Sequence, residues 1–332
     1  MKKFVLCIVL ALFLSVTFNT VQATASMVFK FPVHEPRGSF NNNEYWDWFC
    51  KRVTEVSKGE IKIDLYPSES LCKGADQFEA VRDGLADVGP VIIPYESGTI
   101  KLPTLIELPF SFKDWQTSRK VWEAWLKAGL KDYYEQFGIV LLPGAFLTKF
   151  DIFSSKPIRR LEDMRGLKLR MPGKMSATAL GMLGGVPISV TGGEIYTAIQ
   201  TGTCDGTGLP AQSVFDLKIN EVVKYGIRID LCLTGGPLVV NKKVWSNLPK
   251  NLQGIMEKAA IEAQDNYMEK FDSRNEEALK RMEKEGIKIF TPDPAEKSRW
   301  VQKVMPLWET SAKDLGPKGE ELFKILKSIS GF

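Results

Sequence analysis

The sequence predicts an α/β protein of two lobes, with one long helix that spans both. Strand and helix patterns alternate from residue 27, and the alternation starts again near residue 150, as expected for two sheets built from βαβ units. Residues 249–286 form a single helical pattern rich in Ala, Glu, Lys and Met. At about 1.5 Å per residue this helix would be roughly 50 Å long, which exceeds the width of one lobe.

Residues 1–25 have the pattern of a cleaved secretory signal. Lys2 and Lys3 precede an apolar run from Phe4 to Val16, and small residues at Ala23 and Ala25 suit a signal peptidase. Removing 25 of the 332 residues leaves a chain of about 307, which is enough for two cores. No later apolar stretch approaches the roughly 20 residues that span a bilayer. We therefore expect a soluble, exported protein.

The elements of the first lobe follow from hydrophobic periodicity. Residues 60–67, EIKIDLYP, alternate apolar and polar side chains as a half-buried strand does. Residues 86–94, ADVGPVIIP, are an apolar run typical of a buried strand. Strands that alternate with helices predict a largely parallel sheet. The other elements predicted are a strand at 27–33, helices at 43–56, 75–83 and 115–137, and a strand at 139–146.

The second lobe opens with the strand RGLKLRMP, residues 165–172. Leu167, Leu169 and Met171 point to one face, Arg170 points to the other, and Pro172 ends the strand. The alternation alone favours a solvated Arg170. Further along, Thr191-Gly-Gly-Glu194 has the pattern of a capping box at the start of a short helix, so a structural role is expected for Glu194.

Composition and motifs disfavour several functional classes. The formal charge of +4 falls to about +2 once the two signal lysines are removed, which gives no reason to expect nucleic acid or an anionic membrane as partner. His34 is the only histidine, so a histidine-built metal site is excluded. No nucleophile-base pair, phosphate-binding loop or dinucleotide motif is present. We expect neither enzymatic activity nor a cofactor.

Four cysteines remain outside the signal, and their state is open. An even number in an exported chain permits two disulfides, and Cys50–Cys72 with Cys204–Cys232 would close the shortest loops. Four buried thiols are the other possibility.

The combination of motifs along the chain resembles the extracytoplasmic solute-binding proteins of TRAP (tripartite ATP-independent periplasmic) transporters, the DctP-like family. The matching segments are SKGEIKIDLYPSESL (57–71), DGLADVG (83–89), IELPFSF (106–112), LEDMRGLKLRMP (161–172) and LVVNKKVWSNLP (238–249). The resemblance implies a periplasmic-binding-protein-like fold, with a ligand cleft between two α/β lobes. It also implies a periplasmic monomer that delivers a small carboxylate to membrane permease subunits.

The resemblance also implies lobe boundaries and a role for Arg170. Lobe I would comprise residues 26–147 with 237–275 returning to it, and lobe II residues 148–236 with 276–332 packing on it. In the family, the arginine of the G-L-K-x-R strand pairs with the ligand carboxylate, and Arg170 occupies that position. A guanidinium fork matches a carboxylate bidentately.

Departures from the sialic-acid-binding members indicate a different ligand body. Leu209 replaces an asparagine, Phe150 a second arginine (with Lys149 adjacent), Gly192 an aromatic residue and Ile92 an acidic one. Sugar hydroxyls or a second carboxylate would be left unpaired there. We therefore predict an organic monocarboxylate with an apolar, aryl or indolyl body.

Other interpretations stay open. His34 or Tyr95 could donate a hydrogen bond to a polar group of the ligand, or they could be ordinary loop or core residues. A branched aliphatic keto acid or another carboxylate is the competing substrate class. The same fold could present its ligand to a periplasmic sensor, and a periplasmic enzyme acting on an aromatic acid is the third alternative.

Overall fold

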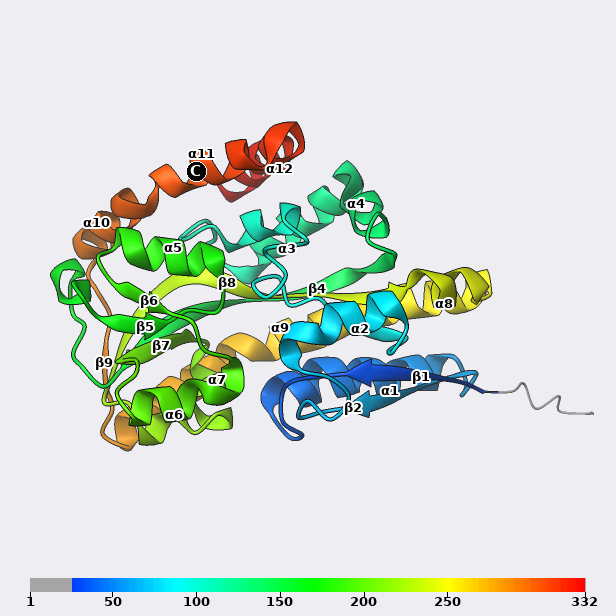
Figure 1. Cartoon of the computed structure of the whole chain (residues 1–332), viewed down its shortest axis with the longest axis horizontal. Coiled ribbons are helices and arrows are strands. Elements are labelled where there is room, and N and C mark those ends of the chain that lie inside the picture. The colour runs from blue at the N-terminus through cyan, green and yellow to red at the C-terminus, as the bar shows by residue number, and fades with distance from the viewer. Residues whose placement is uncertain (1–25, 332) are drawn as a thin grey trace, which may run out of the picture.

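A computed structural model describes residues 26–331, so the predicted signal lies outside the described residues. Its centre is a seven-stranded sheet in the order β3-β8-β4-β7-β5-β6, with β9 beside β8, and β1 and β2 form a separate parallel pair (Figure 1). The strands are β1 (Met27–Pro32), β2 (Ile61–Tyr66), β3 (Val88–Pro90), β4 (Ile139–Ser154), β5 (Lys168–Arg170), β6 (Val186–Ile188), β7 (Gly206–Leu209), β8 (Tyr225–Asn241) and β9 (Lys288–Phe290).

Two long antiparallel strands run the length of the sheet. β4 and β8 pair from Ile139 opposite Asn241 to Ser154 opposite Tyr225. The expectation of a largely parallel sheet was wrong, because β3 and β7 also pair antiparallel with this ladder. Within the seven-stranded sheet, only the peripheral pairs β5–β6, β5–β7 and β8–β9 are parallel. The predicted strand at 139–146 continues to Ser154 because the apolar residues that follow it stay buried.

Buried apolar side chains form four clusters, two toward each end of the sheet. We call first lobe the part built on the two clusters that contain Trp122 and Trp46, and second lobe the part built on those that contain Phe150 and Phe153. The helices before the long one are α1 (Asp47–Val56), α2 (Gln77–Asp83), α3 (Trp115–Trp125), α4 (Lys131–Glu135), α5 (Lys174–Met182), α6 (Ile195–Gln200), α7 (Ala211–Asp216) and α8 (Lys242–Asn247).

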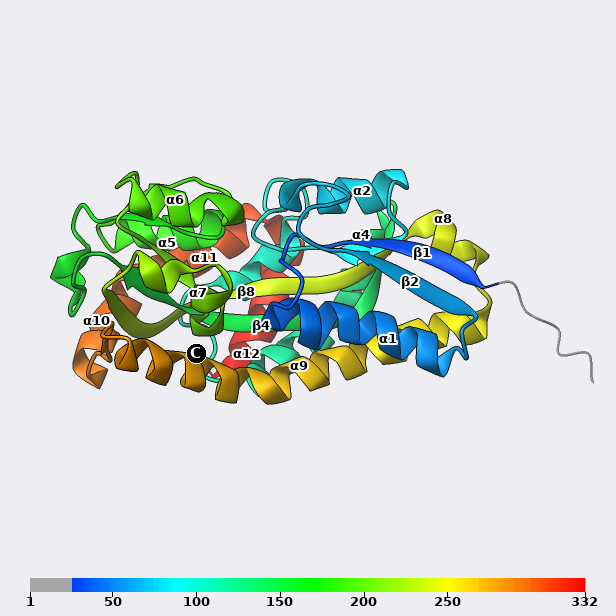
Figure 2. The same cartoon turned by 90° about the horizontal axis from the view of Figure 1, so that it is seen from below.

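The predicted long helix is confirmed as α9 (Lys250–Lys284), which passes along both lobes (Figure 2). Its residues from Leu252 to Phe271 pack in the first lobe, and those from Ala278 to Met282 pack in the second. α9 therefore ties the two cores together.

Neither α9 nor any other helix among the described residues is long and apolar enough to cross a membrane.

The C-terminal helices depart from the expected placement of residues 276–332 on the second lobe. α10 (Pro294–Val304) packs there, whereas α11 (Pro306–Asp314) and α12 (Gly316–Ser330) return to the first lobe and join its core. Two indole groups fix this return. The Nε1 of Trp125 donates to the carbonyl of Leu322 at 2.9 Å, and that of Trp308 donates to the carbonyl of Pro109 at 3.0 Å.

All four cysteines of residues 26–331 are free thiols. Cys50, Cys204 and Cys232 are buried and Cys72 is partly exposed. Burial raises the pKa of the Cys50 and Cys232 thiols well above the usual value, so these two behave as small apolar core residues.

Two glycine substitutions test how closely α9 packs on the sheet. A Cβ at Gly144 in β4 would lie 2.0 Å from the carbonyl oxygen of Ala260 in α9. Gly144→Ala should therefore lower the free energy of unfolding by about 1–3 kcal/mol through overpacking. Gly254→Ala, inside α9 with nothing within 4 Å, should raise it by about 0.5–1 kcal/mol. Denaturant unfolding measures the free energy of unfolding of both variants, and an equal change in the two would contradict this packing.

Candidate functional site

Arg170 ends β5, between β6 and β7, opposite Ile188 and Thr207. Its neighbour Leu169 belongs to the Phe150 cluster of the second lobe, while Arg170 itself is only 3% exposed. The Nε of Arg170 donates to the carbonyl of Val190 at 3.3 Å. The solvated position favoured by the alternation alone was therefore wrong, because the strand end is covered by the segment that follows β6.

The charge of Arg170 has no carboxylate partner among residues 26–331. Other arginines in that range form ion pairs with Asp or Glu, but Arg170 does not. Burying an unpaired charge costs several kcal/mol even after relaxation. An anion at this strand end would offset that cost through charge-assisted hydrogen bonds.

Residues of the first lobe contact the segment that binds Arg170. A Cβ at Gly192, two residues after Val190, would lie 3.7 Å from the hydroxyl of Tyr95. The ring of Tyr95 in turn contacts that of His34, with centroids 5.7 Å apart. We call this row (Arg170, Val190, Gly192, Tyr95 and His34) the interlobe seam.

The two lobes approach each other closely beside the seam. A Cβ at Gly173, just after β5, would lie 2.4 Å from the Cβ of Pro94 in the first lobe. Ile92 lies in the same first-lobe loop, where its carbonyl accepts from the amide of Tyr95 at 2.9 Å, and its side chain is buried in the core. The lobes therefore touch beside Arg170.

Gln77 is a functional candidate that the sequence pattern did not single out. Its Oε1 lies 3.3 Å from Nδ1 of His34, and its Nε2 is buried without a partner. The same His34 nitrogen lies 3.3 Å from a carboxylate oxygen of Glu35. Gln77 precedes the buried Ala80 and Val81 by three and four residues, so helical periodicity could have shown that this amide is buried.

Gln212 is a second such amide, on α7 of the second lobe. It is 3% exposed, and its Nε2 lies 3.5 Å from Oδ1 of Asn41 in the first lobe. Its Oε1 is buried without a partner. Gln77 thus offers an unused donor and Gln212 an unused acceptor, and an unpaired buried polar atom generally finds water or a ligand.

Three predicted site residues lie apart from the seam contacts. Phe150 is 1% exposed, and its ring lies 2.8 Å from where a Cβ at Gly208 would be. Leu209 packs in the Phe153 cluster, a different core cluster from that of Phe150. Lys149 donates to the carbonyl of Lys113 at 2.6 Å and lies 3.5 Å from Asp230. The ammonium of Lys149 is therefore already paired away from Arg170.

The predicted capping box is confirmed. Glu194 accepts from the backbone amide of Thr191 at 2.9 Å and from its hydroxyl at 2.8 Å, and these bonds lower the pKa of Glu194. This geometry supports the structural role expected for Glu194. Within residues 26–331, no three His, Cys, Asp or Glu side chains are grouped as a metal site requires.

The model of the bacterial extracellular solute-binding protein family 7, DctP, matches residues 34–314. The chain belongs to this family. It is a solute-binding protein of a TRAP transporter, and not an enzyme. Proteins of this class bind small ligands and work with membrane permease subunits.

Individual relatives agree with this assignment. The chain is 29% identical over 273 residues to the C4-dicarboxylate-binding periplasmic protein DctP of Rhodobacter capsulatus, covering 81% of each chain. It is 28% identical over 247 residues to a monocarboxylate 2-oxoacid-binding periplasmic protein of Nostoc, covering 72% of this chain and 67% of that protein.

Solved structures confirm the two-lobed α/β fold. A TRAP periplasmic solute-binding protein from Ochrobactrum anthropi superposes with a TM-score of 0.81 at 25% identity, covering 92% of this chain and 96% of that one. One from Desulfovibrio salexigens, with bound orotic acid, has a TM-score of 0.85 at 21% identity, covering 92% and 98%. The relatives named above are periplasmic proteins.

A buried carboxyl next to Tyr95 predicts how stability depends on pH. Burial raises the pKa of Glu96 from 4.5 to about 8. Between these two values the folded protein keeps a proton that the unfolded chain releases, so the free energy of unfolding falls as pH rises from about 5 to 8. Glu96→Gln should remove this part of the slope and be more stable than wild type by about 1–3 kcal/mol at pH 8.5.

The measurement is denaturant unfolding at several pH values, with Glu320→Gln at an exposed position as the matched control. A Glu96→Gln variant with the wild-type slope would show that the carboxyl is not held protonated.

Proposed function

We propose that this solute-binding protein captures an organic monocarboxylate with an apolar, aryl or indolyl body and delivers it to its permease. The observation that carries the proposal is the buried guanidinium of Arg170, which has no carboxylate partner among residues 26–331 and only one hydrogen bond, to a carbonyl. Its two terminal nitrogens could bind a ligand carboxylate bidentately.

Relatives support a carboxylate as the anion. The curated relatives described above are named for a C4-dicarboxylate and for a monocarboxylate 2-oxoacid. The structure from Desulfovibrio salexigens holds orotic acid, and one from Sulfitobacter holds β-D-galacturonate. Each of these molecules carries a carboxyl group, whereas their bodies differ widely.

The apolar body is supported by the residues at the predicted site positions. Ile92 and Leu209 are apolar and each 8% exposed, and in the seam Gly192 places no side chain opposite the Tyr95 hydroxyl. The rings of His34 and Tyr95 lie on the first-lobe side of the seam. An aromatic ligand buries about 150–250 Å², and at about 25 cal/mol/Å² this contributes roughly 4–6 kcal/mol.

One observation favours a more polar carboxylate, such as a sugar acid, as the second candidate. Gln77 Nε2 and Gln212 Oε1 are buried without partners, and ligand hydroxyls could satisfy both. A branched aliphatic keto acid would use Arg170 equally, and its keto oxygen could accept from Gln77 Nε2 but has no proton to donate to Gln212 Oε1. The choice between the candidates depends on which groups reach these two atoms.

The cellular setting is part of the proposal. Residues 1–25 would be removed on export, and the protein would act as a monomer in the periplasm. Lobe I would comprise residues 26–147 with 237–275, and lobe II residues 148–236 with the chain from 276 through α10. The lobes would close over the ligand, because a ligand that contacts both favours the closed state. Presentation to a periplasmic sensor remains the alternative use.

A thermal-shift screen of carboxylates tests the ligand class. At 100 times Kd a ligand should add about 2.7 kcal/mol of stability, or a few degrees in Tm. We expect a response to indole-3-acetate, phenylacetate or benzoate. A response to galacturonate, a branched keto acid or succinate alone would contradict the aromatic body, and no response to any carboxylate would contradict the proposal as a whole.

Substituting Arg170 tests the anchor. Arg170→Ala should raise the Kd of the best carboxylate at least about 30-fold, because the ligand charge would be left buried and unpaired. Arg170→Lys keeps the charge but loses the fork, so it should restore binding only in part. Arg165→Ala, exposed on the same segment, is the matched control. Calorimetric titration measures all three, and wild-type affinity in Arg170→Ala would overturn the anchor.

A further inference from the structure

Two hydrogen bonds connect the lobes on the α9 side. The backbone amide of Phe40 donates to Oδ2 of Asp216 at 3.2 Å, and Nε2 of Gln212 donates to Oδ1 of Asn41 at 3.5 Å. Phe40 and Asn41 are adjacent in the first lobe. Their partners, the acceptor Asp216 and the donor Gln212, both belong to α7 of the second lobe. We call these four residues the interlobe clasp.

The first-lobe half of the clasp is held in place from two sides. The hydroxyl of Tyr267 in α9 donates to Oδ1 of Asn41 at 2.7 Å, and the ring of Phe40 lies 5.0 Å from that of Tyr267. Nδ2 of Asn41 donates to Glu35 at 3.3 Å, and Glu35 also lies 3.3 Å from His34 of the seam. A continuous set of contacts therefore leads from the seam to α7.

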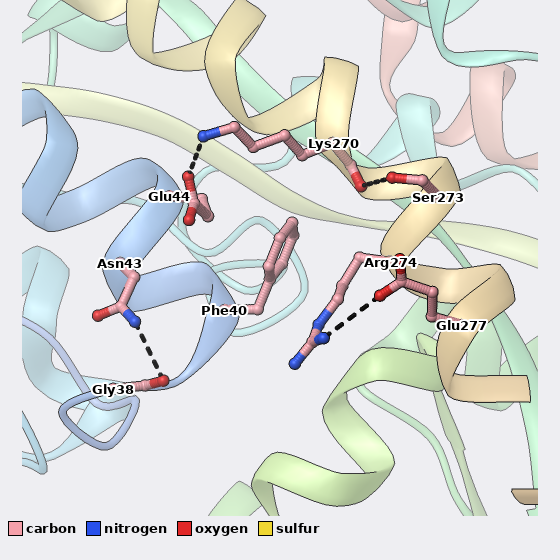
Figure 3. A pocket seen from close by; sticks show the side chains of 8 residues that line it. All are labelled: Gly38, Phe40, Asn43, Glu44, Lys270, Ser273, Arg274 and Glu277. Atoms are coloured by element: carbon pink, nitrogen blue, oxygen red, sulfur yellow. Dashed lines mark hydrogen bonds and ion pairs between the residues drawn. The ribbon is translucent and has the colours of Figure 1, made fainter. Parts of the chain in front are cut away.

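A cavity of about 290 Å³ borders the first-lobe half of the clasp. It lies between segment 38–44 and α9, and Phe40 and Arg274 face it (Figure 3). Its charged side chains are paired with one another, Glu44 with Lys270 and Arg274 with Glu277. The hydrogen bonds to α7 connect segment 38–44 to the second lobe.

We propose that the interlobe clasp positions the lobes for ligand capture, with the hydrogen bonds of Asn41, Gln212 and Asp216 setting affinity through the position of the lobes. Because the bonds join the two lobes, a motion that separates segment 40–41 from α7 would break both. Each bond would then add to the population in which the lobes lie together, and a smaller such fraction would raise the apparent Kd by the same factor for every ligand that needs it. This inference rests on the proposed capture of a carboxylate between the lobes.

A double-mutant cycle on Asn41 and Gln212 tests the clasp. Asn41→Ala and Gln212→Ala should each raise Kd about 3–10-fold, the effect of one hydrogen bond, and the double variant should lose less than the product of the two. The probes are indole-3-acetate, benzoate and galacturonate, or those among them that bind. Asn43→Ala in the same segment and Gln302→Ala on α10 are the matched controls, since neither side chain reaches the other lobe.

The interlobe distance separates closure from direct ligand contact. Spin labels at the exposed Lys62→Cys and Lys303→Cys, in a Cys72→Ser background, report this distance with and without ligand. We expect both clasp variants to widen the distance distribution, and the loss of affinity in Asn41→Ala, whose side chain is not offered as a ligand contact, to be the same for each carboxylate. Gln212→Ala keeps the bonds that Asn41 makes to Tyr267 and Glu35. If Asn41→Ala fails to fold, Gln212→Ala alone still tests the clasp.

Three results would overturn the clasp while leaving carboxylate capture intact. These are wild-type affinity in both variants, losses in Asn41→Ala that differ between carboxylates, and an unchanged distance distribution. If the wild-type protein binds no carboxylate, the proposed function fails. The interlobe distance distribution measured without ligand then tests by itself whether the clasp positions the lobes. A distribution widened relative to both controls supports it, and an unchanged one overturns it.

Discussion

The antiparallel ladder of β4 and β8 is the constraint on which the rest of the structure depends. Because it passes through both lobes, the lobes are two ends of one sheet. The ladder is interrupted between Phe150 and Ile152, where Asp151 accepts the amides of Ile229 and Asp230 at 2.8 and 3.0 Å. A bulge locally bends a strand, and here a buried carboxyl satisfies the backbone groups that the bulge leaves unpaired.

Away from the ladder the lobes meet through both apolar and polar contacts, and Met175 of α5 packs in the Trp122 cluster of the first lobe. Pro94 meets Gly173 at one edge of the interface, and α7 meets segment 40–41 at the other. Arg170, three residues before Gly173, is buried with no carboxylate partner among residues 26–331. Under the proposed function, the ligand carboxylate would offset the cost of this buried charge, and ligand binding would favour closure of the lobes.

The sequence predicted the elements whose signal is local. α9 follows from an unbroken helical pattern, and the Thr191–Glu194 capping box from four adjacent residues. It did not predict that β4 and β8 are continuous, because an apolar run does not show which strand it pairs with. The same limit applies to α12, whose apolar face with Leu322 could pack on either lobe.

The sequence singled out Arg170 through the family resemblance, and it also singled out Gly192, Tyr95 and His34, which the structure places in the same seam. Their binding of a ligand stays a prediction. Periodicity could show that Gln77 and Gln212 are buried, yet whether a buried amide finds a partner depends on residues far away in the chain. For Arg170 the strand alternation favoured solvent. Its burial comes from the segment around Val190, which follows the next strand.

The most direct test of this account is a crystal structure of the protein with the carboxylate that stabilises it most. We expect both carboxylate oxygens within hydrogen-bond distance of the Arg170 guanidinium, with the ligand body between Gly192 and the rings of Tyr95 and His34. A carboxylate bound elsewhere, with Arg170 paired to a protein side chain, would contradict the account.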